Sequence, residues 1–96
     1  MKYSVNVAVQ LLPLGTNQAY EKVDEAIALI EKSGIKYRVC PFETVLEGDY
    51  DEIMQLVKAI QLKCLENGVS DTICNLKIQM RRGADVTIDD KMEKYD

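Results

Sequence analysis

Acidic side chains gather in a ten-residue stretch that contains no basic residue. They are Glu43, Glu47, Asp49, Asp51 and Glu52. The last three fall at the start of a predicted helix, where carboxylates stabilise the positive end of the helix dipole. The first two precede that helix, and with the neighbouring Phe42 and Tyr50 they could hold an organic cation by charge and ring stacking. Paired carboxylates can also act as general acid and base, but no nucleophile or metal motif accompanies them.

Amide side chains alternate with apolar residues in two further segments, one at each end of the chain. Amides both donate and accept hydrogen bonds, which suits subunit packing or the binding of a polar heterocycle. The second segment also carries positive charge, which could bind an anion or form an exposed basic turn. The residues are Asn6 and Gln10 in the first segment and Asn75, Lys77, Gln79, Arg81 and Arg82 in the second.

The composition excludes several functions. There is no histidine, which removes the commonest metal ligand and the best proton shuttle near neutral pH. The formal net charge is −4, which disfavours a nucleic-acid partner. The 3 cysteines are widely spaced, as in reduced cytoplasmic proteins, and no apolar run approaches the ~20 residues of a membrane span. We expect a soluble cytoplasmic protein with no catalytic residue, metal, cofactor, nucleic-acid partner or membrane partner.

The strands and helices that position these residues can be predicted from the spacing of apolar residues and from the residues that begin or end each element. Period-two alternation predicts strands over 3–11, 35–40, 43–47 and 72–81, and apolar stripes predict helices over 18–33 and 49–66. Pro41-Phe42 forms the connection between the middle strands, because proline cannot donate to a sheet ladder. The expected caps are Asn17, Asp49 and Thr87, the last for a short final helix, and the expected helix ends are Ser33-Gly34 and Asn67-Gly68. The first helix should bury Ala19, Val23, Ala26, Ile27 and Ile30 and leave Lys22 outside.

This order predicts an α+β fold, a ferredoxin-like βαββαβ sandwich formed by residues 1–96 as a single domain, followed by the short helix. Right-handed crossovers would place both long helices on one face of a four-stranded antiparallel sheet. The opposite face should then be covered by nothing within the monomer. A solvated face is one interpretation, and a surface for assembly or for a polar ligand is the other.

Strand parity predicts which residues occupy that open face. If Val5, Val7 and Val9 pack under the helices, the intervening residues of the first strand point outward, and the last strand follows the same rule. Thr44 could join them, although Pro41 leaves the parity of its strand undetermined. The outward residues expected at an interface are Asn6, Ala8, Gln10 and Gln79, and Asn75 and Lys77 should lie beside them.

Three stretches of the chain resemble the small UPF0045 family of thiamine-binding proteins. They are Pro13-Leu14-Gly15-Thr16, Thr44-Val45-Leu46-Glu47-Gly48-Asp49, and Leu76-Lys77-Ile78 with Arg81-Arg82. The segment Thr87-Ile88-Asp89-Asp90-Lys91 is similar to the closing helix of the family. The chain departs from the family at Pro41-Phe42-Glu43, where Pro-Met-Gly is more usual, so we expect a differently shaped pocket there.

The resemblance implies a ferredoxin-like protein that pairs through its sheets into a homodimer or homotetramer. It also implies binding of thiamine or its hydroxymethylpyrimidine moiety without catalysis. The residues that it places near the ligand are Thr44, Glu47, Asn75, Lys77 and Arg82.

Two alternatives remain open at this point. Small-molecule-sensing domains of the ACT type share the same element order, so the chain could be a regulatory or oligomerisation module with no thiamine ligand. An enzyme is the second alternative, and it is disfavoured because the sequence offers no histidine and no nucleophile–base pair.

Overall fold

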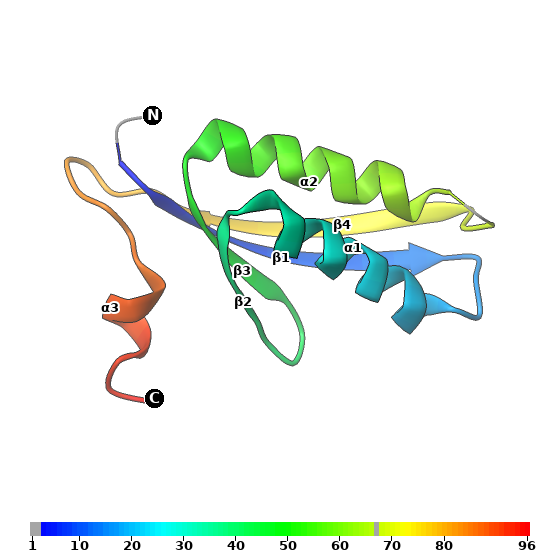
Figure 1. Ribbon diagram of the computed structural model, residues 1–96, viewed down its shortest axis with the longest axis horizontal. Coiled ribbons are helices and arrows are strands. Elements are labelled where there is room, and N and C mark those ends of the chain that lie inside the picture. The colour runs from blue at the N-terminus through cyan, green and yellow to red at the C-terminus, as the bar shows by residue number, and fades with distance from the viewer. Residues whose placement is uncertain (1–2, 67) are drawn as a thin grey trace.

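The computed structural model describes residues 3–66 and 68–96, and it contains the predicted elements in the predicted order (Figure 1). The bounds agree with the expected ranges to within a few residues. The elements are β1 Val5–Leu14, α1 Ala19–Ser33, β2 Lys36–Val39, β3 Thr44–Gly48, α2 Tyr50–Cys64, β4 Asp71–Gln79 and α3 Ile88–Met92. Asn67, which we expected to end the second helix together with Gly68, lies outside the described residues.

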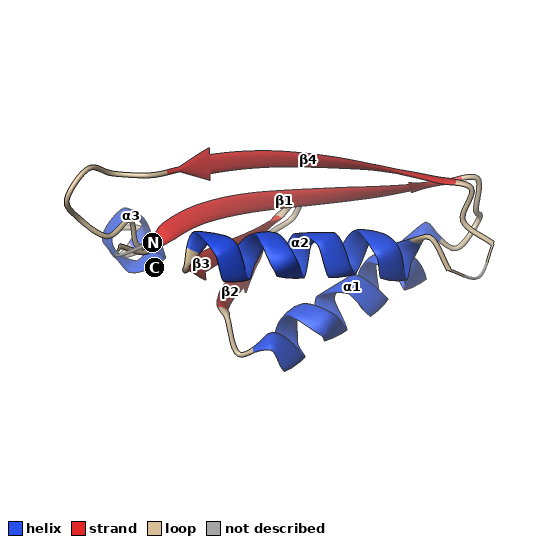
Figure 2. Ribbon diagram, turned by 90° about the horizontal axis from the view of Figure 1, so that it is seen from above, coloured by secondary structure: helices blue, strands red, loops and turns tan. Residues whose placement is uncertain are grey.

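The four strands form one antiparallel sheet in the order β2-β3-β1-β4. The two long helices lie along one side of β1 and β4, and α3 stands apart from them at the end where β1 begins (Figure 2). This is the predicted ferredoxin-like α+β sandwich, with β1 and β3 at its centre. No helix within the described ranges is long and apolar enough to cross a membrane.

The core lies between the sheet and the two long helices. Val7 of β1 pairs with Leu46 of β3 on one side and with Ile78 of β4 on the other. Val7 and Leu46 are fully buried, because their side chains point at the helices. The buried side chains packed on them come mainly from α2, and they are Ile53, Leu56, Val57, Ile60 and Cys64.

The buried stripe of α1 differs from the expected one. Lys22 is buried with Ala26 and Ile30, whereas Val23 and Ile27 are only partly covered. Residues 22, 26 and 30 are spaced by four, so they form one line along the helix. Lys22 tolerates this position because its aliphatic stem packs against neighbours while its ammonium lies 3.7 Å from a carboxylate oxygen of Glu25.

Helix caps were predicted correctly for two helices and wrongly for the third. The carboxylate of Asp49 accepts a hydrogen bond from the Glu52 amide at 3.1 Å, and the Thr87 hydroxyl accepts one from the Asp90 amide at 3.1 Å. Asn17 does not cap α1, which begins one residue later than expected and has no side-chain cap at Gln18.

The late start of α1 follows from the turn before it. Gly15 has φ 73°, and a Cβ atom there would lie 2.0 Å from Oγ of Ser70, so this turn requires glycine. The Thr16 hydroxyl then accepts a hydrogen bond from the Gln18 amide at 3.1 Å. This local bond from Thr16 fixes the turn that leads into α1, and no side chain caps the helix itself.

Replacing Leu46 by alanine tests this core. Leu46 is 0% exposed, so Leu46→Ala should lower the free energy of unfolding by about 2–5 kcal/mol. The matched control is Leu62→Ala on α2, where the side chain is 56% exposed and the change should be within about 0.5 kcal/mol. Urea denaturation followed by circular dichroism measures both, and equal losses would contradict the assignment of Leu46 to the core.

Candidate functional site

The face of the sheet opposite α1 and α2 is lined by the residues that alternate with the core. Asn6 pairs with Gln79, Ala8 with Lys77, and Gln10 with Asn75. The amide nitrogen of Asn75 donates to Oε1 of Gln10 at 3.2 Å. The predicted parity is confirmed for β1 and for the first part of β4, because Val5, Val7 and Val9 belong to the core and the partly buried Cys74 and Leu76 pack against it. Ile78 and Met80, which were expected to pack under the helices with them, are instead 41% and 49% exposed.

Thr44 and Glu47 lie on different faces of β3. Thr44 pairs with Val9 and is buried on the helix side, whereas Glu47 pairs with Asn6 on the open face. The Cys40 amide donates to the Glu43 carbonyl at 2.9 Å, which closes the Pro41-Phe42 turn and sets this parity. Thr44 therefore does not join the open-face residues, and the structure does not bring it together with Glu47.

The expectation of an open face bare within the monomer is wrong at one end. Residues 84–96, which we call the C-terminal strap, cover the start of β1. The Asn6 amide nitrogen donates to the Val86 carbonyl at 2.9 Å, and the Val86 amide donates to the Ser4 carbonyl at 3.0 Å. Val86 is fully buried and Asn6 is 4% exposed. A contact between residues 80 positions apart left no periodic signal in the sequence.

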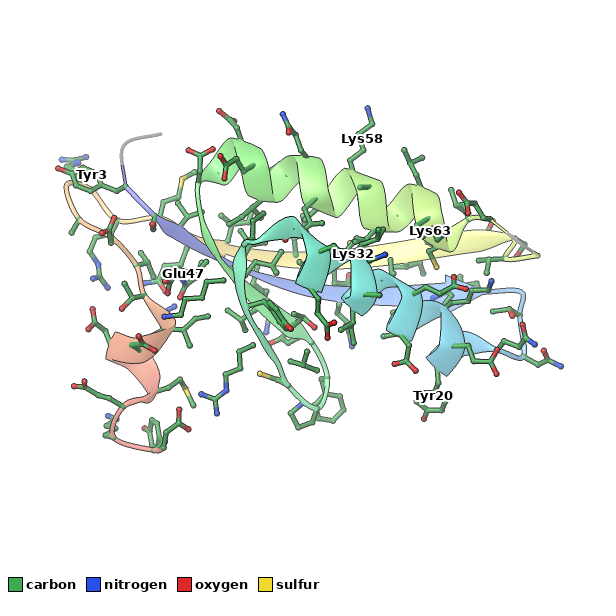
Figure 3. The ribbon with its side chains drawn as sticks, in the orientation of Figure 1. Tyr3, Tyr20, Lys32, Glu47, Lys58 and Lys63 are labelled. Carbon is green, nitrogen blue, oxygen red and sulfur yellow. The ribbon has the colours of Figure 1, made fainter. Side chains whose placement is uncertain are left out.

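Glu47 holds the strap in place. Its Oε1 accepts a hydrogen bond from the Ile88 amide at 2.5 Å, and its Oε2 lies 3.7 Å from the ammonium of Lys36. Figure 3 shows Glu47 between β3 and the segment that leads into α3. Lys36 also contacts Asp89 at 2.9 Å, and this hydrogen bond, with the charge of Glu47, raises the pKa of Lys36 above its ordinary value of 10.5. Both carboxylate oxygens of Glu47 thus have partners inside the chain, which leaves it poorly placed to bind an external cation.

A second ion pair fixes the end of the strap. The guanidinium of Arg38 contacts the two carboxylate oxygens of Asp96 at 2.7 and 3.0 Å. Its hydrogen bonds hold the pKa of Asp96 below the ordinary 3.8 and raise the pKa of Arg38. A carboxyl whose folded-state pKa is lowered stabilises the fold above its unfolded pKa. This contribution is therefore present above about pH 4 and is lost as the pH falls through the lowered value.

The strap and the open face enclose a hollow of about 530 Å³. Its walls combine apolar groups with basic and amide side chains, and no acidic residue of the described chain lines it. The lining residues are Asn6, Ala8, Arg38, Cys40, Pro41, Val45, Lys77, Ile78, Gln79, Ile88, Lys91 and Met92. Oδ1 of Asn6 is buried and has no hydrogen-bond partner. A buried carbonyl oxygen without a partner is costly, but this atom has almost no accessible surface, so it is not open to a guest in the hollow.

Some of the residues predicted to contact the ligand or to form the interface line this hollow, and the others lie elsewhere. Lys77 lines it, as do Asn6, Ala8 and Gln79 from the predicted interface set. Asn75 and Gln10 lie further along the open face, and Arg82 lies in the exposed loop after β4. Their roles in binding stay predictions.

Sequence reasoning missed two basic lining residues, Arg38 and Lys91. Arg38 pairs with Val45, so the two side chains lie on the same face of the sheet. The sequence could have placed Arg38 on this face if the parity of β3 had been known. Nothing in the sequence pattern linked α3, and with it Lys91, to the sheet.

A smaller groove of about 250 Å³ lies on the helix side, between α1 and the β2–β3 turn. Thr44 lines it, together with Phe42 and Tyr20, which are largely exposed. Tyr20 projects away from α1 into solvent in Figure 3. Phe42, at the point of departure from the family pattern, therefore shapes this groove and does not line the larger hollow.

The described residues contain no group of three or more metal-ligating acidic, cysteine or histidine side chains. The three cysteines are free thiols. Burial raises the pKa of the Cys64 and Cys74 thiols, which keeps them protonated and unreactive at neutral pH. The larger hollow is thus arranged for hydrogen bonding and charge contacts with a small guest.

The sheet order, the helix layer and the lined hollow define a ferredoxin-like α+β protein with a candidate small-molecule site on its open face. Within that class, the chain belongs to the thiamine-binding protein family, whose model matches residues 7–96. This confirms the resemblance seen in the sequence.

Known relatives match over nearly the whole chain. A UPF0045 protein of Clostridium perfringens is 41% identical over 91 residues, covering 94% of this chain and 95% of its own. A UPF0045 protein of Methanothermobacter thermautotrophicus is 33% identical over 92 residues, covering 93% of each. Neither these names nor the family description indicates a catalytic activity.

Solved structures share the fold. A domain of unknown function from Bacillus cereus superposes with a TM-score of 0.91 at 35% identity, covering 98% of this chain and 91% of its own. A Thermotoga maritima protein linked by name to thiamine biosynthesis or salvage superposes with a TM-score of 0.87 at 32% identity, covering 97% and 99%.

Removing the Glu47 carboxylate tests its role in holding the strap. In Glu47→Ala the Ile88 amide loses a charged acceptor, which costs about 1–3 kcal/mol, so hydrogen exchange at Ile88 should accelerate by about tenfold or more. Glu43→Ala is the matched control, because the Glu43 side chain makes no hydrogen bond or ion pair among the described residues. Hydrogen exchange followed by NMR gives the comparison, and unchanged protection of Ile88 would contradict the role of Glu47.

Proposed function

We propose that this protein binds thiamine or its hydroxymethylpyrimidine moiety, without transforming it, in the hollow beneath the C-terminal strap. The observation that carries the proposal is the hollow of about 530 Å³ on the open face, whose lining combines apolar groups with the amide and basic side chains of Gln79 and Lys77. Membership of the thiamine-binding protein family and the name of the Thermotoga maritima neighbour point to the same ligand class.

The chemistry of an aminopyrimidine matches these groups. Its exocyclic amine is a hydrogen-bond donor, and the side-chain oxygen of Gln79 is an accessible acceptor in the hollow. Its ring nitrogens are acceptors, and the side chains of Gln79 and Lys77 supply donors in the same hollow. A volume of about 530 Å³ is within the range of small-molecule sites, which are about 300–1,000 Å³.

Binding rather than turnover agrees with the residues at the walls. Proton transfer near neutral pH needs a titrating group near that pH, and the chain has no histidine. Gln79 is an amide and does not titrate. A carrier or sensor of the ligand is therefore the function that these residues support best.

Filling the hollow should abolish binding. In Ala8→Leu the longer side chain occupies space next to Asn6, so the affinity for thiamine and for hydroxymethylpyrimidine should fall by about tenfold or more. Ala28→Leu, on the exposed side of α1, is the control and should bind like the unmodified protein. Isothermal titration measures all three. If neither compound gives a heat of binding with the unmodified protein at high micromolar concentration, the proposal is overturned and a regulatory module is favoured.

Assembly through the uncovered part of the open face is the second half of this proposal. Beyond the strap, Leu12 pairs with Ile73, and the two side chains are 37% and 48% exposed. The alternation of β1 places Leu12 on the same face as Gln10 and Ala8, because Leu11 is in the core. A 96-residue chain buries a modest fraction of its surface, so a second copy on this face would add apolar burial.

A charge at Leu12 tests the assembly. Leu12→Asp would bury a carboxylate between the copies, so the assembly should dissociate into monomers. Leu62→Asp, on the exposed side of α2, should leave the assembly intact. Sedimentation equilibrium gives the mass of each, and a monomeric unmodified protein would overturn this half of the proposal.

A further inference from the structure

The C-terminal strap is attached to the sheet in two different ways along its length. Its first part, residues 84–88, which we call the proximal strap, is packed like the rest of the domain. Val86 is fully buried and Ile88 is 7% exposed. The main chain of this part is also bonded to the sheet, because the Val86 amide donates to the Ser4 carbonyl and the Ile88 amide donates to Glu47. The proximal strap is therefore held by apolar burial and by main-chain hydrogen bonds.

The second part, residues 89–96, which we call the distal strap, has no buried side chain. One of its side chains is partly covered and the others are exposed. Its main-chain hydrogen bonds that the structure describes stay inside the segment. Its bonds to the sheet come from two carboxylates: Asp89 contacts the ammonium of Lys36 at 2.9 Å, and Asp96 contacts the guanidinium of Arg38 at 2.7 and 3.0 Å. These two ion pairs therefore provide the attachment of the distal strap.

Both ion pairs are open to solvent. The side chains of Arg38 and Asp96 are 39% and 53% exposed, and those of Lys36 and Asp89 are 48% and 79% exposed. Exposed pairs of this kind contribute little and are screened by salt. Helix α3 has five residues, which is too short to persist without packing. A segment with few buried contacts opens locally at low cost, while the core stays folded.

We propose that the distal strap opens and closes beside the hollow as one unit, latched by the Lys36–Asp89 and Arg38–Asp96 ion pairs, while the proximal strap stays docked. This inference goes beyond the proposed function, because it does not depend on the identity of any ligand. Lys91 and Met92 line the hollow from the distal strap, whereas Ile88 lines it from the proximal strap. Opening therefore removes one wall and keeps the others, and raised salt favours the open state.

The test is limited cleavage of the full chain by trypsin after Lys91. A protease cuts the locally opened form, so the rate follows the population of that form when opening is fast relative to cleavage. Each rate is divided by that of a peptide of residues 84–96 with the same substitution in the same buffer, which removes effects on trypsin itself. At about 50 mM salt this ratio should rise about two- to fivefold in Asp96→Asn. Raising the salt to about 500 mM should increase the ratio for the unmodified protein and change it less for the variant.

Glu93→Gln is the matched control. It removes one carboxylate from the same segment, and Glu93 makes no ion pair among the residues that the structure describes, so its ratio should equal that of the unmodified protein. Hydrogen exchange at the Val86 amide, followed by NMR, reports the proximal strap and should be the same in Asp96→Asn as in the unmodified protein.

Three results would overturn the inference. The first is an unchanged ratio in Asp96→Asn or an equal rise in Glu93→Gln. The second is a ratio that does not depend on salt in the unmodified protein, a measurement that needs no variant. The third is faster exchange at Val86 by the same factor as the cleavage, which would show that the strap opens as a single piece. Thermal melting of each variant establishes that it is folded.

Discussion

The alternation of side chains along β1 is the constraint on which the rest of this structure depends. Successive residues of a strand point to opposite faces, so one central strand serves two different layers. Val5, Val7 and Val9 pack under the helices, while Asn6 and Ala8 face the strap. A slip of one residue would exchange these sets, placing a polar amide in the core and valines in the hollow. The buried valines therefore fix the register of β1, and that register also places Asn6 at the candidate site.

The site is assembled from the two ends of the chain. Asn6 lies near the start and Val86 near the end, and their hydrogen bond joins the first strand to the strap. Glu47 and Lys36 add the middle of the chain through their contacts with Ile88 and Asp89. The strap and the sheet both line the hollow, so a guest that contacted both would stabilise the docked strap by mass action.

Much of the fold could be predicted because its signals are local. The Asp49 cap and the alternation of β1 and β4 depend on residues a few positions apart, and both were predicted correctly. The errors concern longer-range relations. Lys22 is buried because the face of α1 that carries residues 22, 26 and 30 packs against its neighbours. The helical periodicity alone could not distinguish this face from the adjacent apolar stripe. The covering of Asn6 and the arrival of Lys91 at the hollow depend on tertiary contacts about 80 residues apart in sequence, which leave no periodic signal.

The ion pairs that hold the strap lie beside the hollow and involve both of the basic residues of β2. The acidic groups nearest to it, Glu47, Asp89 and Asp96, are each engaged by Lys36 or Arg38 of β2. Three carboxylates share two basic partners, so this network keeps one negative charge in excess. Lys77 of β4 and Lys91 of α3 also line the hollow, and neither takes part in the network. The acids near the site therefore secure the strap, whereas the lysines of β4 and α3 line the hollow without contributing to that attachment.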